Sequence, residues 1–310
     1  MKTTNNNIVV IGSTNVDMIV KGDRLPKSGE TIIGGRFFKA AGGKGANQAV
    51  AAARAGGRVT FLSRVGNDVF GQEAIQGYRN DKINVSYIKV DQAESTGIAL
   101  ILVDSKGENC ISVASGANMK LDQSDIKDAI DELDNADVVL MQLETPIETI
   151  EYIIKLLKNK QVKTILNPAP ALKISDDLLR HLTIITPNET EVELLTGVPV
   201  NNKKDALKAS KILLDKGVKN VIITMGKKGA FLHTKLNYKF IPTFEVSALD
   251  TTAAGDTFNG ALAVAVAEGK ALEDAIQYAN AAAAISVTKM GAQPSIPLKN
   301  EIDDFLSHSG

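Results

Sequence analysis

The chain contains the stretch Leu249-Asp250-Thr251-Thr252-Ala253-Ala254-Gly255-Asp256-Thr257-Phe258-Asn259-Gly260, in which small residues lead to a single carboxylate. Apolar residues then recur with helical spacing until Gly269, which predicts a helix that ends at this glycine. The loop before such a helix presents free backbone N–H groups and a positive dipole end to an anion. The Asp256 carboxylate could accept a proton from a substrate hydroxyl there, although aspartate is also a common helix N-cap.

On the N-terminal side of this stretch, strand-like and helix-like segments alternate. The predicted strands are short, rich in β-branched residues and bounded by turns: Ile8–Ile11, Val59–Ser63, Val138–Leu143, Lys163–Leu166, Leu182–Ile185 and Asn220–Thr224. The predicted helices are Lys44–Ala55, Asp68–Asn80, Pro146–Lys158 and Lys203–Lys216. This alternation predicts an α/β fold with a mostly parallel sheet that helices cover on both faces.

Two segments depart from the alternation. Ile19–Phe38 has scattered glycine and proline and little helical periodicity. Ile98–Val103, a polar turn and Cys110–Val113 together predict a β-hairpin. The two segments predict a small separate sheet, which is either a lid over a pocket or a hairpin without a functional task.

Composition limits the class of protein. The 310 residues suit one large α/β domain or two domains, and the net charge is −1, from 35 basic and 36 acidic residues without a basic block. This balance argues against nucleic acid or an anionic membrane as the main partner. The single Cys110 excludes an internal disulfide and fits a reducing compartment, and neither an export signal nor a membrane-spanning run is recognisable. We therefore expect a soluble cytoplasmic protein.

A glycine-rich segment, Ala41–Gln48, opens the first clear helix. Its glycines allow a ligand to approach the backbone closely, and Lys44 and Asn47 fall near the helix N-terminus. It is neither a P-loop nor a dinucleotide-binding motif, because the required spacings are absent. The segment is therefore either a ligand-binding turn or an ordinary strand-to-helix turn with an exposed lysine.

Further polar side chains follow predicted strands at the edge where ligands bind in open α/β sheets. Asn15 and Asp17 follow the first strand and suit paired sugar hydroxyls, or they form a polar turn. Glu144 follows another strand, as a ligand residue or as an ordinary loop acid.

Two segments later in the chain suit a nucleotide. Asn188 and Glu191 fit the pattern of a capping box at the start of a helix. Alternatively, their side-chain oxygens lie where water-bound Mg²⁺ would approach nucleotide phosphates. The turn Thr224–Gly229 could hold phosphate or ribose by backbone contacts, or simply join two strands of a hairpin.

Taken together, these motifs resemble the ribokinase family of carbohydrate kinases. The resemblance rests on Gly42–Gln48, Asn188-x-x-Glu191 and Ala253–Phe258, and also on Met141–Glu144, Leu166–Pro170 and Gly291–Ser295. It extends over nearly the whole chain. Most family members have Gly-Ala-Gly-Asp before the helix, whereas Ala253 replaces the first glycine here.

The resemblance implies a three-layer α/β/α domain spanning residues 1–310. Lid segments at about 19–38 and 98–113 would also form a homodimer. It implies transfer of the ATP γ-phosphoryl group to O5 of D-ribose, with Asp256 as general base beside an anion hole at Ala253, Ala254 and Gly255. The implied sugar ligands are Asn15, Asp17, Gly43, Lys44, Asn47, Glu144 and Asp256. The implied nucleotide contacts are Asn188, Thr224, Gly226, Lys227, Gly229, Gly255 and Asn280, with Asn188 and Glu191 serving Mg²⁺ through water.

The resemblance also implies a K⁺ site beside the anion hole. Its residues would be Asp250, Thr252, Ser286, Lys289, Gly291 and Ser295, of which Thr252, Lys289 and Gly291 contribute backbone carbonyls. Taken alone, Asp250 is more simply interpreted as stabilising a turn. Two other functions stay open: a related kinase for deoxyribose, fructose or a nucleoside, and a catalytically silent sugar-binding protein on the same fold.

Overall fold

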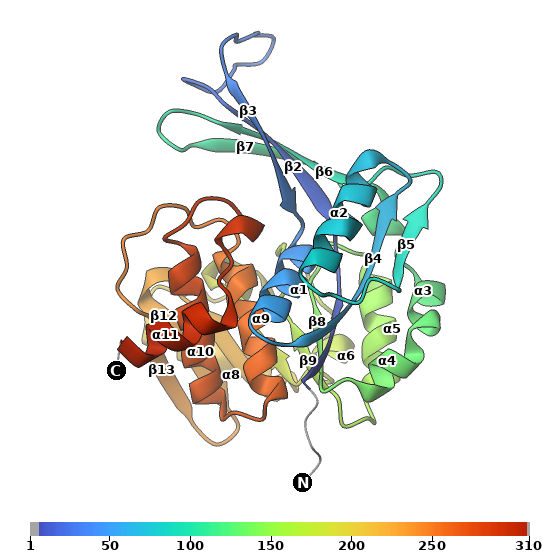
Figure 1. Ribbon diagram of the computed structural model, residues 1–310. Helices are drawn as coiled ribbons and strands as arrows, with labels where there is room; N and C mark the ends of the chain where they lie inside the picture. Colours follow the sequence, from blue (N-terminus) through green and yellow to red (C-terminus); the bar gives the residue numbers. More distant parts are fainter. Residues whose placement is uncertain (1–5, 309–310) are drawn as a thin grey trace.

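The computed structural model describes residues 6–308 and contains a central sheet with helices on both faces (Figure 1). Within these residues nine strands form this sheet in the order β13-β12-β11-β10-β9-β8-β1-β4-β5. Only the β11–β12 and β12–β13 pairs are antiparallel. The bounds are β1 Asn7–Ile11, β4 Arg58–Gly66, β5 Ile88–Asp91, β8 Val138–Met141, β9 Lys163–Leu166, β10 Ile184–Ile185, β11 Asn220–Thr224, β12 Gly229–Thr234 and β13 Tyr238–Pro242.

Alternate residues of the central strands belong to two separate cores. Ile8 and Val10 pack with one group of helices, whereas Val9 and Ile11 pack with the other. The first core includes residues of α1 Lys44–Arg54, α2 Val69–Asn80, α9 Ala254–Ala267, α10 Leu272–Ser286 and α11 Lys299–His308. The second includes α3 Gln123–Asp128, α4 Ile130–Asn135, α5 Ile147–Leu157, α6 Asp176–Leu179, α7 Glu189–Thr196 and α8 Lys203–Asp215. The predicted three-layer α/β/α architecture is confirmed, because successive side chains of a strand point to opposite faces.

Helices α1 and α9 pack closely although they come from opposite ends of the sequence. A Cβ atom at Gly260 would lie 2.5 Å from the Ala51 Cβ, so only glycine allows this approach. Small buried side chains along both helices, such as Ala49 and Ala261, maintain it. The contact brings the N-termini of the two helices, Lys44 and Ala254, to the same edge of the sheet (Figure 1).

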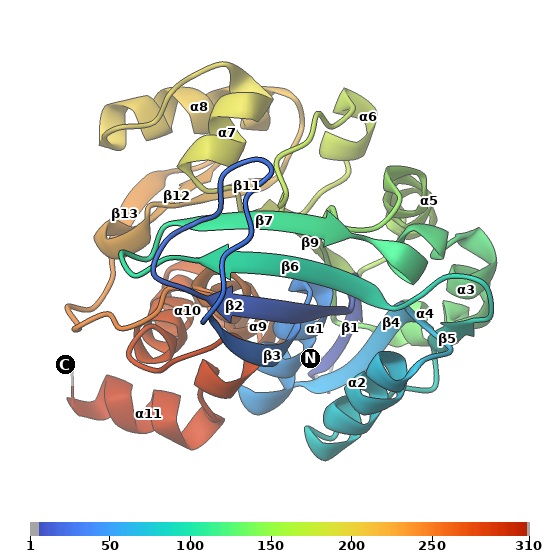
Figure 2. The ribbon, with the colours of Figure 1, turned by 90° about the horizontal axis from the view of Figure 1, so that it is seen from above.

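A second sheet projects from the body, and in the view from above it lies across the middle of the molecule (Figures 1 and 2). Its order in the described residues is β3-β2-β6-β7, with β2 Asn15–Lys21, β3 Arg36–Gly42, β6 Gly97–Val103 and β7 Asn109–Ala114. The predicted separate sheet and its hairpin are confirmed. Its strands extend further toward the body than predicted, because β2 begins at Asn15 and β3 continues to Gly42. Asn15 and Asp17 are therefore strand residues and not parts of a polar turn.

The base of this sheet is attached to the body by one carboxylate. Asp68 caps α2 by accepting a hydrogen bond from the Gly71 backbone N–H at 2.8 Å. The same side chain accepts hydrogen bonds from the Thr96 N–H at 2.8 Å and the Thr96 hydroxyl at 2.7 Å, directly before β6. These bonds hold the Asp68 pKa below its usual value, although burial opposes them. Among residues 6–308 we find no helix with the length and apolar character needed to cross a membrane.

Candidate active site

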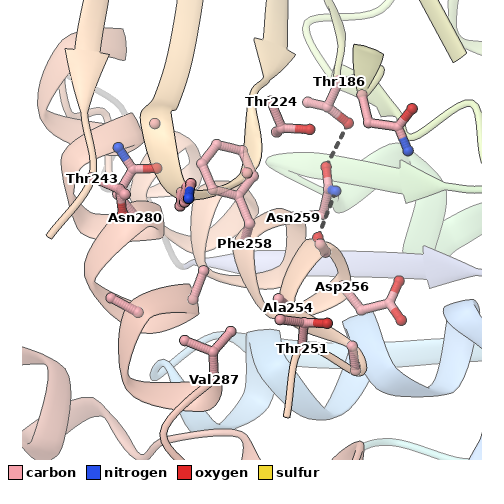
Figure 3. Close-up of a pocket in the computed structure, with 18 of the residues that line it drawn as sticks. Thr186, Thr224, Thr243, Thr251, Ala254, Asp256, Phe258, Asn259, Asn280 and Val287 are labelled. Atoms are coloured by element: carbon pink, nitrogen blue, oxygen red, sulfur yellow. Dashed lines mark hydrogen bonds between the residues drawn. The ribbon is translucent and has the colours of Figure 1, made fainter. Parts of the chain in front are cut away.

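A cavity of about 890 Å³ opens along the carboxyl ends of β9, β10 and β11 and above the N-terminus of α9 (Figure 3). This volume is typical of sites for ligands of nucleotide size. Asp256, Lys44 and Asn188 contribute polar and charged groups, and Val246, Phe258 and Val287 supply apolar surface. The cavity therefore offers both charged and apolar surface to one ligand.

Asp256 lies in the first turn of α9, inside the helix. The N-cap is Ala253, whose φ of 58° is left-handed, so interpreting Asp256 as a helix cap is wrong. Asn47 Nδ2 donates to Asp256 Oδ2 at 3.0 Å, and Gln48 Nε2 donates to Oδ1 at 2.9 Å. Burial raises the pKa of Asp256, whereas Lys44 and the two amide donors oppose that rise. The result is a carboxylate of increased basicity with both oxygens held in place.

Lys44 lies among several carboxylates at the start of α1. Its backbone N–H donates to Glu144 Oε2 at 2.9 Å, and the Ser13 hydroxyl donates to the same oxygen. Burial lowers the pKa of Lys44, but the charges of Asp256, Glu144 and other carboxylates outweigh burial and raise it. The ammonium group therefore stays charged beside the cavity, so interpreting Lys44 as an exposed turn lysine is wrong.

A second cavity, of about 510 Å³, lies beside Glu144 and Asn15 under the projecting sheet. Asn15 Oδ1 accepts a hydrogen bond from Asn118 Nδ2 at 2.7 Å, which fixes the orientation of the Asn15 amide. The Asp17 carboxylate abuts Gly42, where a Cβ atom would lie 2.4 Å from Oδ1. Burial, with help from Glu144 and Asp256, raises the pKa of Asp17 to about 6.

Two polar groups in this region lack protein partners. Within residues 6–308 the partly buried Asp17 carboxylate has no hydrogen-bond donor, and Asn47 Oδ1 is fully buried without one. A buried polar atom without a partner costs free energy unless a ligand or water satisfies it. Asn15, Asp17, Asn47 and Glu144 thus converge from β2, α1 and the loop after β8, at the place predicted for hydroxyl recognition.

The segments that the sequence associates with a nucleotide line the larger cavity. They are Asn188, Thr224, Gly226, Lys227, Gly229 and Asn280. The hairpin alternative for Thr224–Gly229 is also correct, because this turn joins the antiparallel strands β11 and β12. The turn therefore connects two strands and also lines the cavity, so the two interpretations do not exclude each other.

Asn188 and Glu191 form the predicted capping box at the start of α7. Asn188 Oδ1 accepts from the Glu191 N–H at 2.9 Å, and Glu191 Oε2 accepts from the Asn188 N–H at 2.9 Å. Burial raises the pKa of Glu191. Both residues also line the cavity, so the capping box and the predicted place for a metal ion coincide.

The loops predicted to hold K⁺ lie side by side. The Gly291 N–H donates to Asp250 Oδ2 at 2.8 Å, and the Leu249 N–H donates to the Val287 carbonyl at 2.7 Å. Asp250 Oδ1 also accepts from the Thr252 N–H, so the turn-stabilising role of Asp250 is present. Ser286 and Ser295 lie on either side of Gly291 in the sequence, and both are fully buried. The hydroxyl of each serine donates a hydrogen bond to a backbone carbonyl. Oxygen atoms are abundant here, as a K⁺ site would require.

Several residues at the site were not predicted from the sequence. Gln48, Asn167, Thr186 and Asn259 are buried around Asp256, and Ser13 contacts Glu144. Gln48 was visible at the end of the glycine-rich segment, and Asn259 one helical turn after Asp256. Thr186 and Asn167 directly follow strands β10 and β9, and their position at the carboxyl edge is the only signal.

Comparison with known proteins gives consistent matches. A family model described as pfkB family carbohydrate kinase matches residues 5–299. The ribokinase of Haemophilus influenzae is 45% identical over 302 residues, which cover 97% of this chain and 99% of that protein. A deoxyribokinase of Salmonella typhimurium is 39% identical and covers 97% of this chain and 98% of that protein. The structure of Arabidopsis thaliana ribokinase complexed with ribose and ATP is 35% identical, covers 96% of this chain and 98% of that chain, and has a TM-score of 0.90.

Proposed function

The chain belongs to the pfkB family of carbohydrate kinases, and on this premise we propose that it transfers the γ-phosphoryl group of ATP to O5 of D-ribose, giving ribose 5-phosphate and ADP. The observation that carries the proposal is the position of Asp256. Its buried carboxylate lies at the N-terminus of α9, between the cavity suited to a nucleotide and the polar groups suited to a sugar.

In this reaction Asp256 accepts the proton of the O5 hydroxyl while that oxygen attacks the γ-phosphorus and the bond to the ADP oxygen breaks. Its raised pKa favours this proton transfer, because a base accepts a proton more readily as its pKa approaches the working pH. The backbone N–H groups of Gly255 and Asp256, in the first turn of α9, would face the charge on the transferred group, whereas the Ala254 N–H donates to the Thr251 carbonyl. Lys44 adds a positive charge beside them.

The sugar would lie under the projecting sheet, which acts as a lid. Asn15, Asp17, Gly43, Lys44, Asn47 and Glu144 would bind its hydroxyl groups. The buried, unpartnered Asn47 Oδ1 supports this assignment, because a sugar hydroxyl would supply the missing donor. A closed lid would also exclude water, which otherwise competes with the sugar for the phosphoryl group.

The nucleotide would occupy the larger cavity, with its phosphates toward Asn188 and Thr224–Gly229 and its base toward Asn280 and the apolar side chains of the lining. Mg²⁺ on the phosphates would be held through water by Asn188 and Glu191, and would neutralise charge on the transferred group. K⁺ would bind between the Asp250–Thr252 loop and the segment from Ser286 to Ser295. There it would offset the Asp250 charge and fix the anion-hole loop.

We further propose that the lid forms a homodimer. Residues paired across its strands share a face, and both faces are apolar: Ile19, Phe38, Ile101 and Ile111 on one, and Val20, Phe37, Leu102 and Cys110 on the other. Phe37 is 61% and Ile111 53% exposed in the single chain. An open apolar sheet favours association, and a second lid would cover it.

The whole chain would act as one domain in the cytoplasm, where ATP is available.

A coupled assay of ADP release over D-ribose, 2-deoxyribose, fructose and adenosine tests the proposed reaction. We expect the highest kcat/KM with D-ribose. A higher kcat/KM with 2-deoxyribose, the substrate indicated by the name of the Salmonella relative, would mean that the substrate is the deoxy sugar and not ribose. Absence of ADP release with all four acceptors would leave the catalytically silent alternative.

A further inference from the structure

A closed ring of buried hydrogen bonds lies behind Asp256. Gln48 Nε2 donates to Asp256 Oδ1 at 2.9 Å and to Asn167 Oδ1 at 3.0 Å. Asn167 Nδ2 donates to the Thr186 carbonyl at 3.2 Å, and the Thr186 hydroxyl donates to Asn259 Oδ1 at 2.6 Å. Asn259 Nδ2 donates to the Gly255 carbonyl at 2.8 Å, and the peptide bond from Gly255 to Asp256 closes the ring. Figure 3 shows the bond between Thr186 and Asn259 above Asp256.

The orientation of every amide in this ring is determined by its chemistry. The ionised Asp256 carboxylate and the carbonyls of Thr186 and Gly255 can only accept hydrogen bonds. Each of these acceptors must therefore face an amide N–H₂ group. The amide oxygens of Asn167 and Asn259 then face the remaining donors, which are Gln48 Nε2 and the Thr186 hydroxyl. Gln142 Nε2 donates to Gln48 Oε1 at 2.6 Å and fixes the last amide in the same sense.

We propose that Gln48, Asn167, Thr186 and Asn259 are positioning residues that hold the Asp256 carboxylate and the backbone of the anion hole in one rigid unit. The inference rests on the proposed kinase function. The side chains of Gln48 and Asn259 are almost wholly buried. They act on the reaction through Asp256 and Gly255.

The geometry explains how one ring controls two catalytic features. At one end, Gln48 fixes an oxygen of the Asp256 carboxylate. At the other end, Asn259 holds the Gly255 carbonyl pointing along α9. The Asp256 N–H belongs to the same planar peptide group as this carbonyl and points the opposite way, toward the transferred phosphoryl group. Base and anion-hole donor therefore keep a constant separation, as phosphoryl transfer requires.

The ring also has an electrostatic consequence, because a donor to a carboxylate stabilises its ionised form. The charged groups around Asp256 are Lys44 on α1, Asp17 on β2, Glu144 after β8 and Glu191 on α7. None of these groups changes when Gln48 is replaced. Loss of the Gln48 donor should raise the Asp256 pKa and move the acidic limb of the pH–rate profile to higher pH.

The first test uses Gln48→Met, which keeps similar volume and removes the amide. We expect kcat for ribose to fall about 10- to 100-fold while the KM for ATP stays within about twofold. We expect the acidic limb of kcat/KM to move up by about one pH unit. Gln48→Met leaves the Gln142 amide without its hydrogen-bond partner and should lower the melting temperature. The double variant Gln48→Met with Gln142→Leu removes that amide, so it should regain the lost melting temperature but not the wild-type pH profile.

The second test uses Thr186→Val, which breaks the link to Asn259, and Thr186→Ser, which keeps the hydroxyl. Thr164→Val is the matched control, because Thr164 is a similarly buried threonine within β9 whose hydroxyl lies outside the ring. We expect Thr186→Val to lower kcat about tenfold and Thr186→Ser to restore it. Thr164→Val should lower only the melting temperature.

Carbon-13 NMR titration of labelled aspartate, with Asp256→Asn assigning the signal, measures the Asp256 midpoint without any turnover. An unchanged midpoint and unchanged pH limb in folded Gln48→Met would overturn the proposal, as would a Thr186→Val enzyme that behaves like Thr164→Val. Failure of the proposed function can be distinguished from failure of the ring proposal, because in the first case the wild-type protein itself would not phosphorylate ribose. The NMR midpoint would still test the ring in that case.

Discussion

Asn47 and Asp256 are 209 residues apart in the sequence, and their side chains meet through a hydrogen bond of 3.0 Å from Asn47 Nδ2 to Asp256 Oδ2. Asn47 uses its amide nitrogen on the proposed base and leaves its oxygen free for a ligand. One side chain therefore connects the proposed base to the proposed sugar site, and a bound sugar would be aligned with the carboxylate that removes its proton.

Replacing Asp256 by Asn should abolish most of the activity, because size and some hydrogen bonding remain while basicity is lost. We expect kcat to fall at least about 10²-fold, as is usual on loss of a general base. ATP binding, measured by calorimetry, should survive. An Asp256→Asn enzyme with nearly normal kcat would show that another group takes the proton.

Replacing Asp17 or Glu144 by Ala should weaken ribose binding by about 1–3 kcal/mol each, the usual cost of a hydroxyl left without a partner in a closed pocket. Glu144→Ala should also lower the melting temperature, since Glu144 accepts bonds from Ser13 and the Lys44 backbone. Asp17 has no such structural bond. Ribose titration with unchanged affinity in both variants would place the sugar elsewhere.

The raised pKa of Asp17 predicts a pH dependence whose sign can be stated. In the unfolded chain Asp17 ionises near its ordinary value of 3.8, but in the ligand-free folded protein only near 6. Between these values the unfolded state loses its proton first, so stability falls as pH rises through this window. Asp17→Asn should therefore raise the melting temperature at pH 8 more than at pH 4. An equal difference at both values would contradict the shift.

The same group predicts weaker sugar binding in acid. A protonated Asp17 accepts hydroxyl hydrogens less well than the carboxylate. The Kd for ribose should rise as pH falls below about 6, and Asp17→Asn should flatten this dependence. Calorimetry of ribose binding at a series of pH values measures both curves, and parallel curves would assign the effect to another group.

The lid should place two chains in a symmetric dimer. Light scattering should give twice the chain mass at micromolar concentration. Ile111→Lys, on the edge strand β7, should dissociate the dimer, because a buried lysine without a partner is costly. A fully active wild-type monomer would exclude the dimer as a requirement for catalysis.

Activity should rise several-fold when K⁺ replaces Na⁺ at constant ionic strength, if the cation fixes the anion-hole loop. Asp250→Ala should remove this response. Its existing bonds to Thr252 and Gly291 mean that the variant will also loosen the two loops. The informative quantity is therefore the ratio of rates in the two salts, and a wild-type ratio near one would leave Asp250 as a turn residue.

The layered fold could be predicted from the sequence because its signals are local. Val138–Met141 and Asn220–Thr224 are short β-branched runs, and their predicted limits nearly match the observed strands. Asn15–Lys21 was harder to recognise, since Asn15 and Asp17 are polar on a face that covers a site instead of a core. Pairing with β3 and β6 forms this strand, and such distant pairing leaves no periodic trace.

The candidate site divides in the same way. Asp256, Lys44 and Asn188 stand in motifs that a resemblance can identify. Gln48 and Thr186 owe their positions to hydrogen bonds that join α1 to the residue after β9, and the residue after β10 to α9; these segments lie far apart in the sequence. A buried glutamine has no local pattern that separates a positioning role from simple burial, so only the folded geometry reveals it.

The close contact of α1 with α9 has a consequence for biosynthesis. During translation, α1 emerges early with a face of small apolar residues such as Ala49 and Val50 that has nothing to cover it. Its partner α9, including Gly260, is synthesised only after every strand of the central sheet. This face therefore stays uncovered for most of synthesis, and no ribosome-bound intermediate that lacks α9 can assemble the site. The proposed activity is therefore acquired late, after α9 and also α10, which carries Asn280, have been made.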